Sequence, residues 1–488
     1  MNNRKNLIAV AITFLLIFAG YLVKWEQNQK FNNLRGFYSQ KIKWESCYQN
    51  FFCGSFRVPI NYDDPGTGYF TLQAIKHVAS DNSNRLGALL VNPGGPGGSA
   101  YDYAMSADAI VSNALYKTFD IVGFDGRGIG ESEPIRCLTD KEEDAFINID
   151  GTNSSQSTLI AAAKTFADSC KKVAGLKIGH VSTFETAKDM DILRALLHEK
   201  KLNYLGKSYG TYLGAIYISL FPATVGKFVL DGAVDPNISI RDQSLNQTAG
   251  FEKSLDDFLS ANSTFKKADI QNLIERAGIK PLKDKKRRAL NRSLLITAIA
   301  ASLYDNGLGW ANLKLGLSNA LSKSDPSHLL KLADDYNNRD NTGHYYNNQN
   351  DIGIAINCLD WRSRNSFDEL TADLPNFVKA SQTFGKYIAY SQLPCAYWSA
   401  PPIQPKLPFK DIKSPPFLII GVTKDPATPY IWAKNLASEF PSSVLLTLNG
   451  EGHTGHNRGV ACIDTKVDGL FLHGELPESG ISCVSGGN

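Results

Sequence analysis

The chain has 488 residues, of which 43% are hydrophobic and 20% are charged. This balance excludes wholesale disorder and fits one large core with an inserted lobe. The formal net charge of +3 is too small to indicate a nucleic-acid partner, and we expect the densest basic run, Lys283–Arg288, to solvate a helix face.

The N-terminal segment has the order of an export signal. Arg4 and Lys5 precede an apolar stretch at 7–23, which Lys24 follows. A cleavage site is poorly defined, and the stretch is nearly long enough to cross a bilayer. We therefore predict an exported protein, either periplasmic, extracellular or attached to the cell envelope. Residues 1–30 would be a signal peptide or a membrane anchor; a buried N-terminal helix is the weaker alternative.

The next predicted elements alternate between short apolar strands and helices. The predicted strands are Arg57–Tyr62, Tyr69–Val78, Ala88–Asn92, Phe119–Phe124, Leu202–Leu205, Lys227–Leu230, Pro416–Val422 and Ser443–Leu448. The predicted helices are Thr186–His198, Thr211–Leu220 and Tyr430–Glu439. Short buried strands between helices predict an α/β fold with a mostly parallel central sheet and helices on both faces.

The segment 237–410 breaks this alternation. It is polar and helical, contains loops rich in Asn and Asp, and lacks strand-like runs. We interpret it as a mainly helical cap inserted into the connectivity of the sheet. The core would then consist of residues 31–236 and 411–488.

The eight cysteines are an even number in a chain that begins with an export-like segment. This combination predicts disulfides formed in an oxidising compartment, although the pairing stays open. No CxxC motif or Cys/His cluster has the spacing of a metal site. The sequence thus predicts no metal and no cofactor.

The segment Gly206–Gly210 reads Gly-Lys-Ser-Tyr-Gly and lies between a predicted strand and a predicted helix. In this context the G-x-S-x-G pattern predicts a sharp turn that lifts Ser208 clear of the sheet as a nucleophile. The two glycines are expected because larger side chains would collide across the turn.

A serine hydroxyl needs a base, and the base needs a carboxylate that orients it. His453 follows the last predicted strand, and Asp425 follows the strand before it. The order Ser, Asp, His is typical of a nucleophile on a strand-to-helix turn. His456 is an alternative base and Asp231 an alternative acid.

Two backbone N–H groups should meet the negative charge that develops on the substrate carbonyl oxygen. One is predicted from Tyr209, directly after the nucleophile. The glycine-rich loop at 92–99 should supply the other, from Gly95, with Gly94 or Gly97 as alternatives.

With these pieces placed, the chain resembles the prolyl iminopeptidase and tripeptidyl aminopeptidase branch of the α/β-hydrolase fold. The motifs that carry the resemblance are Gly94–Ser99, Asp125–Ser132, Gly206–Thr211, Val229–Pro236, Asp425–Pro429 and Gly474–Cys483. The last of these resembles the C-terminal region of exported tripeptidyl aminopeptidase-like members. The resemblance implies Ser208, Asp425 and His453 as a catalytic triad under a cap. One departure is Gly126, where the family usually has proline.

The same resemblance suggests that the substrates are peptides with a free N-terminus. A carboxylate must then hold the substrate ammonium, and Asp360 is the candidate because it lies among apolar residues; a solvent-facing Asp360 is the alternative. We therefore predict an exported serine exopeptidase that releases N-terminal residues or tripeptides. A serine esterase or amidase acting on small hydrophobic esters is the second hypothesis, and a non-catalytic surface binding domain is the third.

Overall fold

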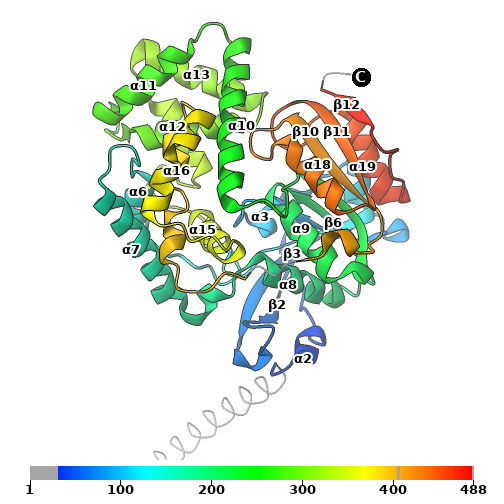
Figure 1. Cartoon of the computed structure of the whole chain (residues 1–488). Helices are drawn as coiled ribbons and strands as arrows, with labels where there is room; N and C mark the ends of the chain where they lie inside the picture. The colour runs from blue at the N-terminus through cyan, green and yellow to red at the C-terminus, as the bar shows by residue number, and fades with distance from the viewer. Residues whose placement is uncertain (1–30, 404–406, 486–488) are drawn as a thin grey trace, which may run out of the picture.

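The computed structural model describes residues 31–403 and 407–485 (Figure 1). The predicted signal or anchor at 1–30 therefore lies outside the described residues. Within the described part of the chain, no helix combines the length and the apolar character needed to cross a membrane.

A ten-stranded sheet forms the centre of the described fold, in the order β1-β2-β3-β5-β4-β6-β7-β10-β11-β12. The strands are β1 (Glu45–Tyr48), β2 (Phe51–Pro59), β3 (Tyr69–His77), β4 (Gly87–Asn92), β5 (Phe119–Phe124), β6 (Leu202–Lys207), β7 (Val225–Asp231), β10 (Phe417–Lys424), β11 (Ser443–Glu451) and β12 (Ser482–Val484). Neighbouring strands are parallel from β5 to β12, and β1 to β3 form an antiparallel edge. The predicted fold class is confirmed.

The first strand differs from its prediction. β2 begins at Phe51 rather than Arg57, because its first three residues pair with β1 at the open edge of the sheet. Side chains there are mostly exposed or half-buried, so the apolar alternation that marks a strand is weak.

Helices cover both faces because successive side chains of each strand point to opposite sides. On β4, Ala88 and Leu90 pack on the side of α8 (Thr183–Leu196), α9 (Tyr209–Leu220) and α18 (Tyr430–Glu439). Leu89 and Val91 pack on the opposite side, against α3 (Ala100–Met105) and α19 (Ala461–His473).

Beside the sheet lies a helical lobe (Figure 1). It contains α10 (Ile240–Ala261), α11 (Lys267–Ile279), α12 (Arg292–Ser302), α13 (Leu308–Lys323), α14 (Ser327–Tyr336), α15 (Gln349–Asp360), α16 (Phe367–Ala380) and α17 (Gly385–Ile388). Two earlier helices, α6 (Asp140–Ile147) and α7 (Gln156–Ala174), lie on the same side. Leu159 and Ala163 of α7 pack with Leu370 and Leu393.

The expectation that this lobe has no strands is wrong in one place. β8 (Leu282–Lys283) pairs with β9 (Ala289–Leu290), and the basic run Lys283–Arg288 forms the end of β8 and the turn to β9 instead of a helix face. Arg288 is paired there with Asp334. A turn of charged residues between two-residue strands gives no period-2 signal.

All eight cysteines are paired, which confirms the predicted disulfides. The pairs are Cys47–Cys53, Cys137–Cys170, Cys358–Cys395 and Cys462–Cys483. The third pair ties α15 to the segment after α17, and the fourth ties α19 to the last strand.

A buried ion pair supports the loop after β5. Arg127 is 1% exposed, and its Nε and Nη2 donate to Asp189 at 2.6 and 2.7 Å. It also donates to the carbonyl oxygens of Pro59 and Ile60. The ion pair therefore joins this loop to α8 and to the end of β2.

Replacing Arg127 by Met would leave Asp189 as an unpaired buried charge. We expect the free energy of unfolding to fall by about 3–5 kcal/mol, measured by urea denaturation. The double variant Arg127→Met/Asp189→Leu should recover part of that loss because neither charge is then buried. A loss below ~1 kcal/mol in the single variant would contradict this account.

Candidate active site

Ser208 lies on a strained turn between β6 and α9. Its φ is 55°, a value that is uncommon outside glycine. A Cβ on Gly206 would lie 2.5 Å from the carbonyl oxygen of Gly210, and one on Gly210 would lie 2.7 Å from Asn92 Oδ1. Side chains at either position would collide, as the sequence predicts.

Asp425 and His453 come from the turns after β10 and β11 and are in direct contact. Both carboxylate oxygens lie 2.9 Å from His453 Nδ1. The buried Asp425 also accepts hydrogen bonds from the N–H groups of Ala427 and Thr428 and from the Thr428 hydroxyl. Because a carboxylate only accepts, this network assigns the proton of the neutral ring to Nδ1 and leaves Nε2 as an acceptor.

Ser208 lines a small pocket together with a residue that contacts the Asp425–His453 pair. Thr428 lines that pocket together with Ser208. The Ser208 N–H donates to the carbonyl oxygen of Asp231, and a Cβ on the next residue, Gly232, would lie 3.2 Å from His453 Cε1. Among the described residues, no hydrogen bond joins the Ser208 hydroxyl to His453; such bonds are often long in unliganded sites and shorten around substrate.

The alternative acid and base have other contacts. Asp231 is fully buried and accepts the N–H groups of Gly455 and His456 at 2.7 and 3.0 Å. His456 is 2% exposed, and burial, together with the charge of Lys207, lowers its pKa to about 3. Its Nδ1 has no partner among the described residues. The geometry therefore favours His453 with Asp425 over His456 with Asp231.

The glycine-rich loop lies against the turn that carries Ser208. A Cβ on Gly94 would lie 2.8 Å from Ser208 Cβ, so only glycine fits there. Gly95 and Tyr209 line the Ser208 pocket. Tyr209 is the first residue of α9, where the N–H has no acceptor within the helix. Gly97 instead lies under α15, where its Cβ would be 3.0 Å from the Gln349 carbonyl oxygen.

Asp125 holds the end of the glycine-rich loop through hydrogen bonds. It is fully buried and accepts hydrogen bonds from the Ser99 hydroxyl and from the N–H groups of Tyr101 and Glu131. Burial raises the pKa of its carboxyl to about 6. The contacts join the end of the glycine-rich loop to the loop after β5.

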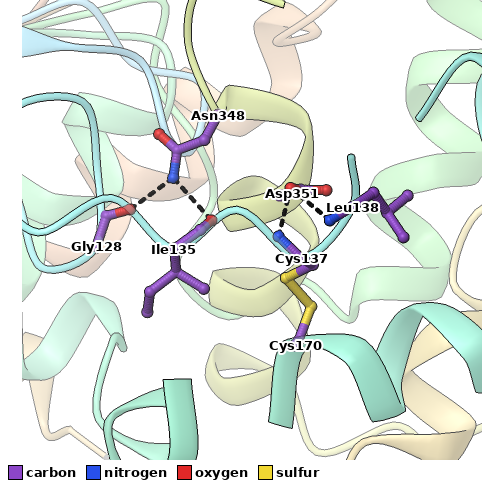
Figure 2. Close-up of a disulfide and its surroundings, with 7 residues drawn as sticks. All are labelled: Gly128, Ile135, Cys137, Leu138, Cys170, Asn348 and Asp351. Carbon is purple, nitrogen blue, oxygen red and sulfur yellow. Dashed lines mark hydrogen bonds between the residues drawn. A yellow bond between two sulfur atoms is a disulfide. The ribbon is translucent and has the colours of Figure 1, made fainter. Parts of the chain in front are cut away.

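Helix α15 is tied to the core at its start (Figure 2). Asn348 Nδ2 donates to the carbonyl oxygens of Gly128 and Ile135 at 2.7 and 2.9 Å. Asp351 accepts the N–H of Cys137, next to the Cys137–Cys170 disulfide. This anchoring fixes the direction of α15, whose other end reaches the Ser208 pocket.

Asp360, the last residue of α15, lines the Ser208 pocket and is 1% exposed. The alternative of a solvent-facing Asp360 is therefore wrong. Its carboxylate accepts the N–H and the hydroxyl of Thr183 at 2.9 and 2.5 Å, and that hydroxyl also contacts the hydroxyl of Tyr209. Burial raises the pKa of Asp360 to about 7.

Two residues near His453, Tyr304 and Arg458, were not predicted from the sequence. Tyr304 follows α12, and its carbonyl oxygen accepts the N–H of His453 at 2.8 Å. Its ring meets the imidazole edge-on, with centroids 5.3 Å apart. Arg458 donates to Asn306 and to the carbonyl oxygen of Glu451. The cap thus contacts the loop that carries His453, through residues that belong to no recognisable motif.

A cavity of about 400 Å³ adjoins the Ser208 pocket. The two share Gln243 and Gln247 from α10, Asn357 from α15, and Trp361. The cavity lies between helices of the helical lobe, and Tyr304 lines it on the side of His453. This arrangement offers a substrate space that ends at Ser208.

Comparison with known proteins agrees with this geometry. Residues 87–274 match the family model described as alpha/beta hydrolase fold, and residues 380–483 match the model described as TAP-like protein.

Three relatives are similar over most of the chain. Serine protease Hip1 of Mycobacterium tuberculosis is 31% identical, with 91% of each chain covered. Tripeptidyl aminopeptidase of Streptomyces coelicolor is 32% identical, covering 91% of this chain and 86% of its own. Carboxylesterase B of M. tuberculosis is 34% identical, covering 88% and 86%.

Proposed function

Since the chain belongs to the tripeptidyl aminopeptidase-like family of α/β-hydrolase-fold serine hydrolases, we propose that it is an exopeptidase that releases residues or short peptides from free N-termini. The observation that carries the proposal is one pocket that holds Ser208 and a buried carboxylate, beside the hydrogen-bonded pair His453–Asp425.

In the proposed reaction, Ser208 Oγ attacks the scissile carbonyl carbon while His453 Nε2 takes the hydroxyl proton. Asp425 holds the ring by Nδ1 and stabilises the imidazolium. The N–H groups of Tyr209 and Gly95 stabilise the oxyanion. His453 then protonates the leaving amine, and water activated by the same nitrogen hydrolyses the acyl-enzyme, which restores Ser208.

Asp360 is proposed to hold the substrate ammonium. Among the described residues that line the pocket and the cavity, it alone carries a carboxylate. Thr183 donates one hydrogen bond to each carboxylate oxygen of Asp360, and each oxygen has a further lone pair that can accept another. An ammonium placed there would favour the charged carboxylate against burial.

Asp360→Asn is expected to raise KM for free-amine peptides roughly 10- to 100-fold, because a charge-assisted hydrogen bond is lost. The KM for p-nitrophenyl acetate, an ester without an ammonium group, should show no such change. An unchanged KM for the free-amine peptide would reject this role of Asp360.

The pH dependence of KM tests the same contact. Because burial raises the pKa of Asp360 to about 7, its carboxyl group in the substrate-free enzyme is increasingly protonated below that pH. The KM of the wild-type enzyme for free-amine peptides should therefore rise about tenfold per pH unit below 7. The Asp360→Asn variant, assayed in parallel, should lack this rise.

Export is part of the proposal. Four disulfides among the described residues support an oxidising compartment. Cell fractionation of the full chain, with and without residues 1–30, tests it; recovery of both forms in the cytosol would contradict export.

The substrate class is tested with Ala-Ala-Pro-p-nitroanilide and its N-acetylated twin, with Ser208→Ala as the blank. Hydrolysis of the free-amine form alone would support an exopeptidase that reads the N-terminus. Hydrolysis of both forms, or of neither, would reject that specificity and favour the second hypothesis, an esterase or amidase.

A further inference from the structure

The cavity beside the Ser208 pocket is lined by uncharged side chains. None of the described residues that form its wall is Asp, Glu, Lys, Arg or His. Most of the wall consists of apolar side chains, and uncharged phenol, hydroxyl and amide groups lie between them. A charged substrate group that entered this space would lose its hydration and find no counter-charge, so its binding there is strongly disfavoured.

One polar atom of this wall lacks a partner. Gln243 Oε1 is buried and accepts no hydrogen bond from any described residue. Two other amides of the wall are engaged: Gln247 Nε2 donates to the carbonyl oxygen of Ala427, and Gln392 Nε2 donates to Ser244 Oγ. A buried acceptor without a donor is destabilising by itself, and an N–H of a bound peptide is one donor that would satisfy it.

Gln243 lies at the junction of the two spaces, since it lines both the cavity and the Ser208 pocket. Trp361, which also lines both, directly follows Asp360. A peptide whose ammonium is held at Asp360 would therefore place its N-terminal portion at this junction.

We infer that the cavity selects peptides whose acyl-side residues carry uncharged side chains, with Gln243 accepting a hydrogen bond from a substrate N–H. The inference rests on the proposed function, because it assigns the acyl side to the cavity. A neutral amide serves this role better than a carboxylate would, since it leaves no charge in the apolar wall.

The test uses free-amine peptide p-nitroanilides in which each position carries Leu, Gln, Glu or Lys in turn. All peptide groups of these substrates lie on the acyl side. At one position at least, Glu and Lys should lower kcat/KM by roughly 100-fold relative to Gln and Leu. If Gln and Glu are cleaved equally well at every position, the inference is overturned.

Variants of Gln243 identify the residue responsible. Gln243→Glu should raise kcat/KM for the disfavoured Lys peptide by about tenfold or more, because the cavity then holds a counter-charge. Gln243→Met should raise KM for neutral peptides by about tenfold through loss of the acceptor. Gln382→Glu, at an exposed site after α16, is the matched control and should change neither value.

Hydrolysis of p-nitrophenyl acetate separates the two possible failures, because its acetyl group is too small to occupy the cavity. If the ester is cleaved and neutral free-amine peptides are not, the proposed function fails, and this inference fails with it. If neutral peptides are cleaved but Gln243→Glu and Gln382→Glu behave alike towards the Lys peptide, only the role of Gln243 is overturned.

Discussion

The variant His453→Gln is expected to lower kcat for p-nitrophenyl acetate by roughly 10⁴- to 10⁶-fold. Gln cannot take the Ser208 proton, and a neutral serine hydroxyl is a weak nucleophile. His453 Nδ1 lies 2.9 Å from both carboxylate oxygens of Asp425, and Thr428, which donates to Asp425, lines the Ser208 pocket. The measurement is a steady-state assay on protein whose fold is checked by circular dichroism.

His456→Gln is the matched control, three residues along the same loop. Because the His456 ring is buried away from any carboxylate partner among the described residues, the variant should alter stability while kcat stays within about threefold. A large loss of kcat in His456→Gln, with activity retained in His453→Gln, would reverse the assignment of the base.

The second large effect is expected for Asp425→Asn, which should lower kcat by about 10⁴-fold. The amide would present an N–H to His453 and favour the wrong tautomer, so that Nε2 no longer accepts the serine proton. KM should change little, because Asp425 does not line the Ser208 pocket. The variant's kcat and KM are measured on the same ester.

Asp231→Asn distinguishes a catalytic carboxylate from a structural one. Asp231 accepts the N–H groups of Gly455 and His456 and lies near the half-buried Lys207. Its replacement should lower the free energy of unfolding by about 2–4 kcal/mol and leave kcat of the folded protein within tenfold. Equal losses of kcat in both Asp variants would contradict this division of roles.

Much of the fold could be predicted because its signals are local. The buried parallel strands β4, β5 and β10 read as continuous apolar runs, since both of their faces are covered by helices. The turn at Ser208 was predictable because only glycine fits on either side of it. Strand β2, which lies next to the edge strand β1, was misplaced, and the short β8–β9 pair was missed, because half-exposed or charged strands lack that signal.

The parts of the site that come from the cap could not be predicted in the same way. Tyr304 reaches His453 through its backbone carbonyl oxygen, a contact that almost any residue could make. Gln243 and Trp361 meet only after α10 and α15 are packed. Asp360 was identified by its apolar neighbours in sequence, but its burial and its bonds to Thr183 depend on tertiary structure.

The most direct measurement is the site of covalent labelling by a fluorophosphonate, read by intact mass and peptide mapping. One adduct is expected, located on Ser208, and its formation should be strongly slowed in His453→Gln because the unassisted hydroxyl reacts poorly. An adduct on another residue, or no adduct on folded wild-type protein, would contradict the claim that Ser208 is the nucleophile.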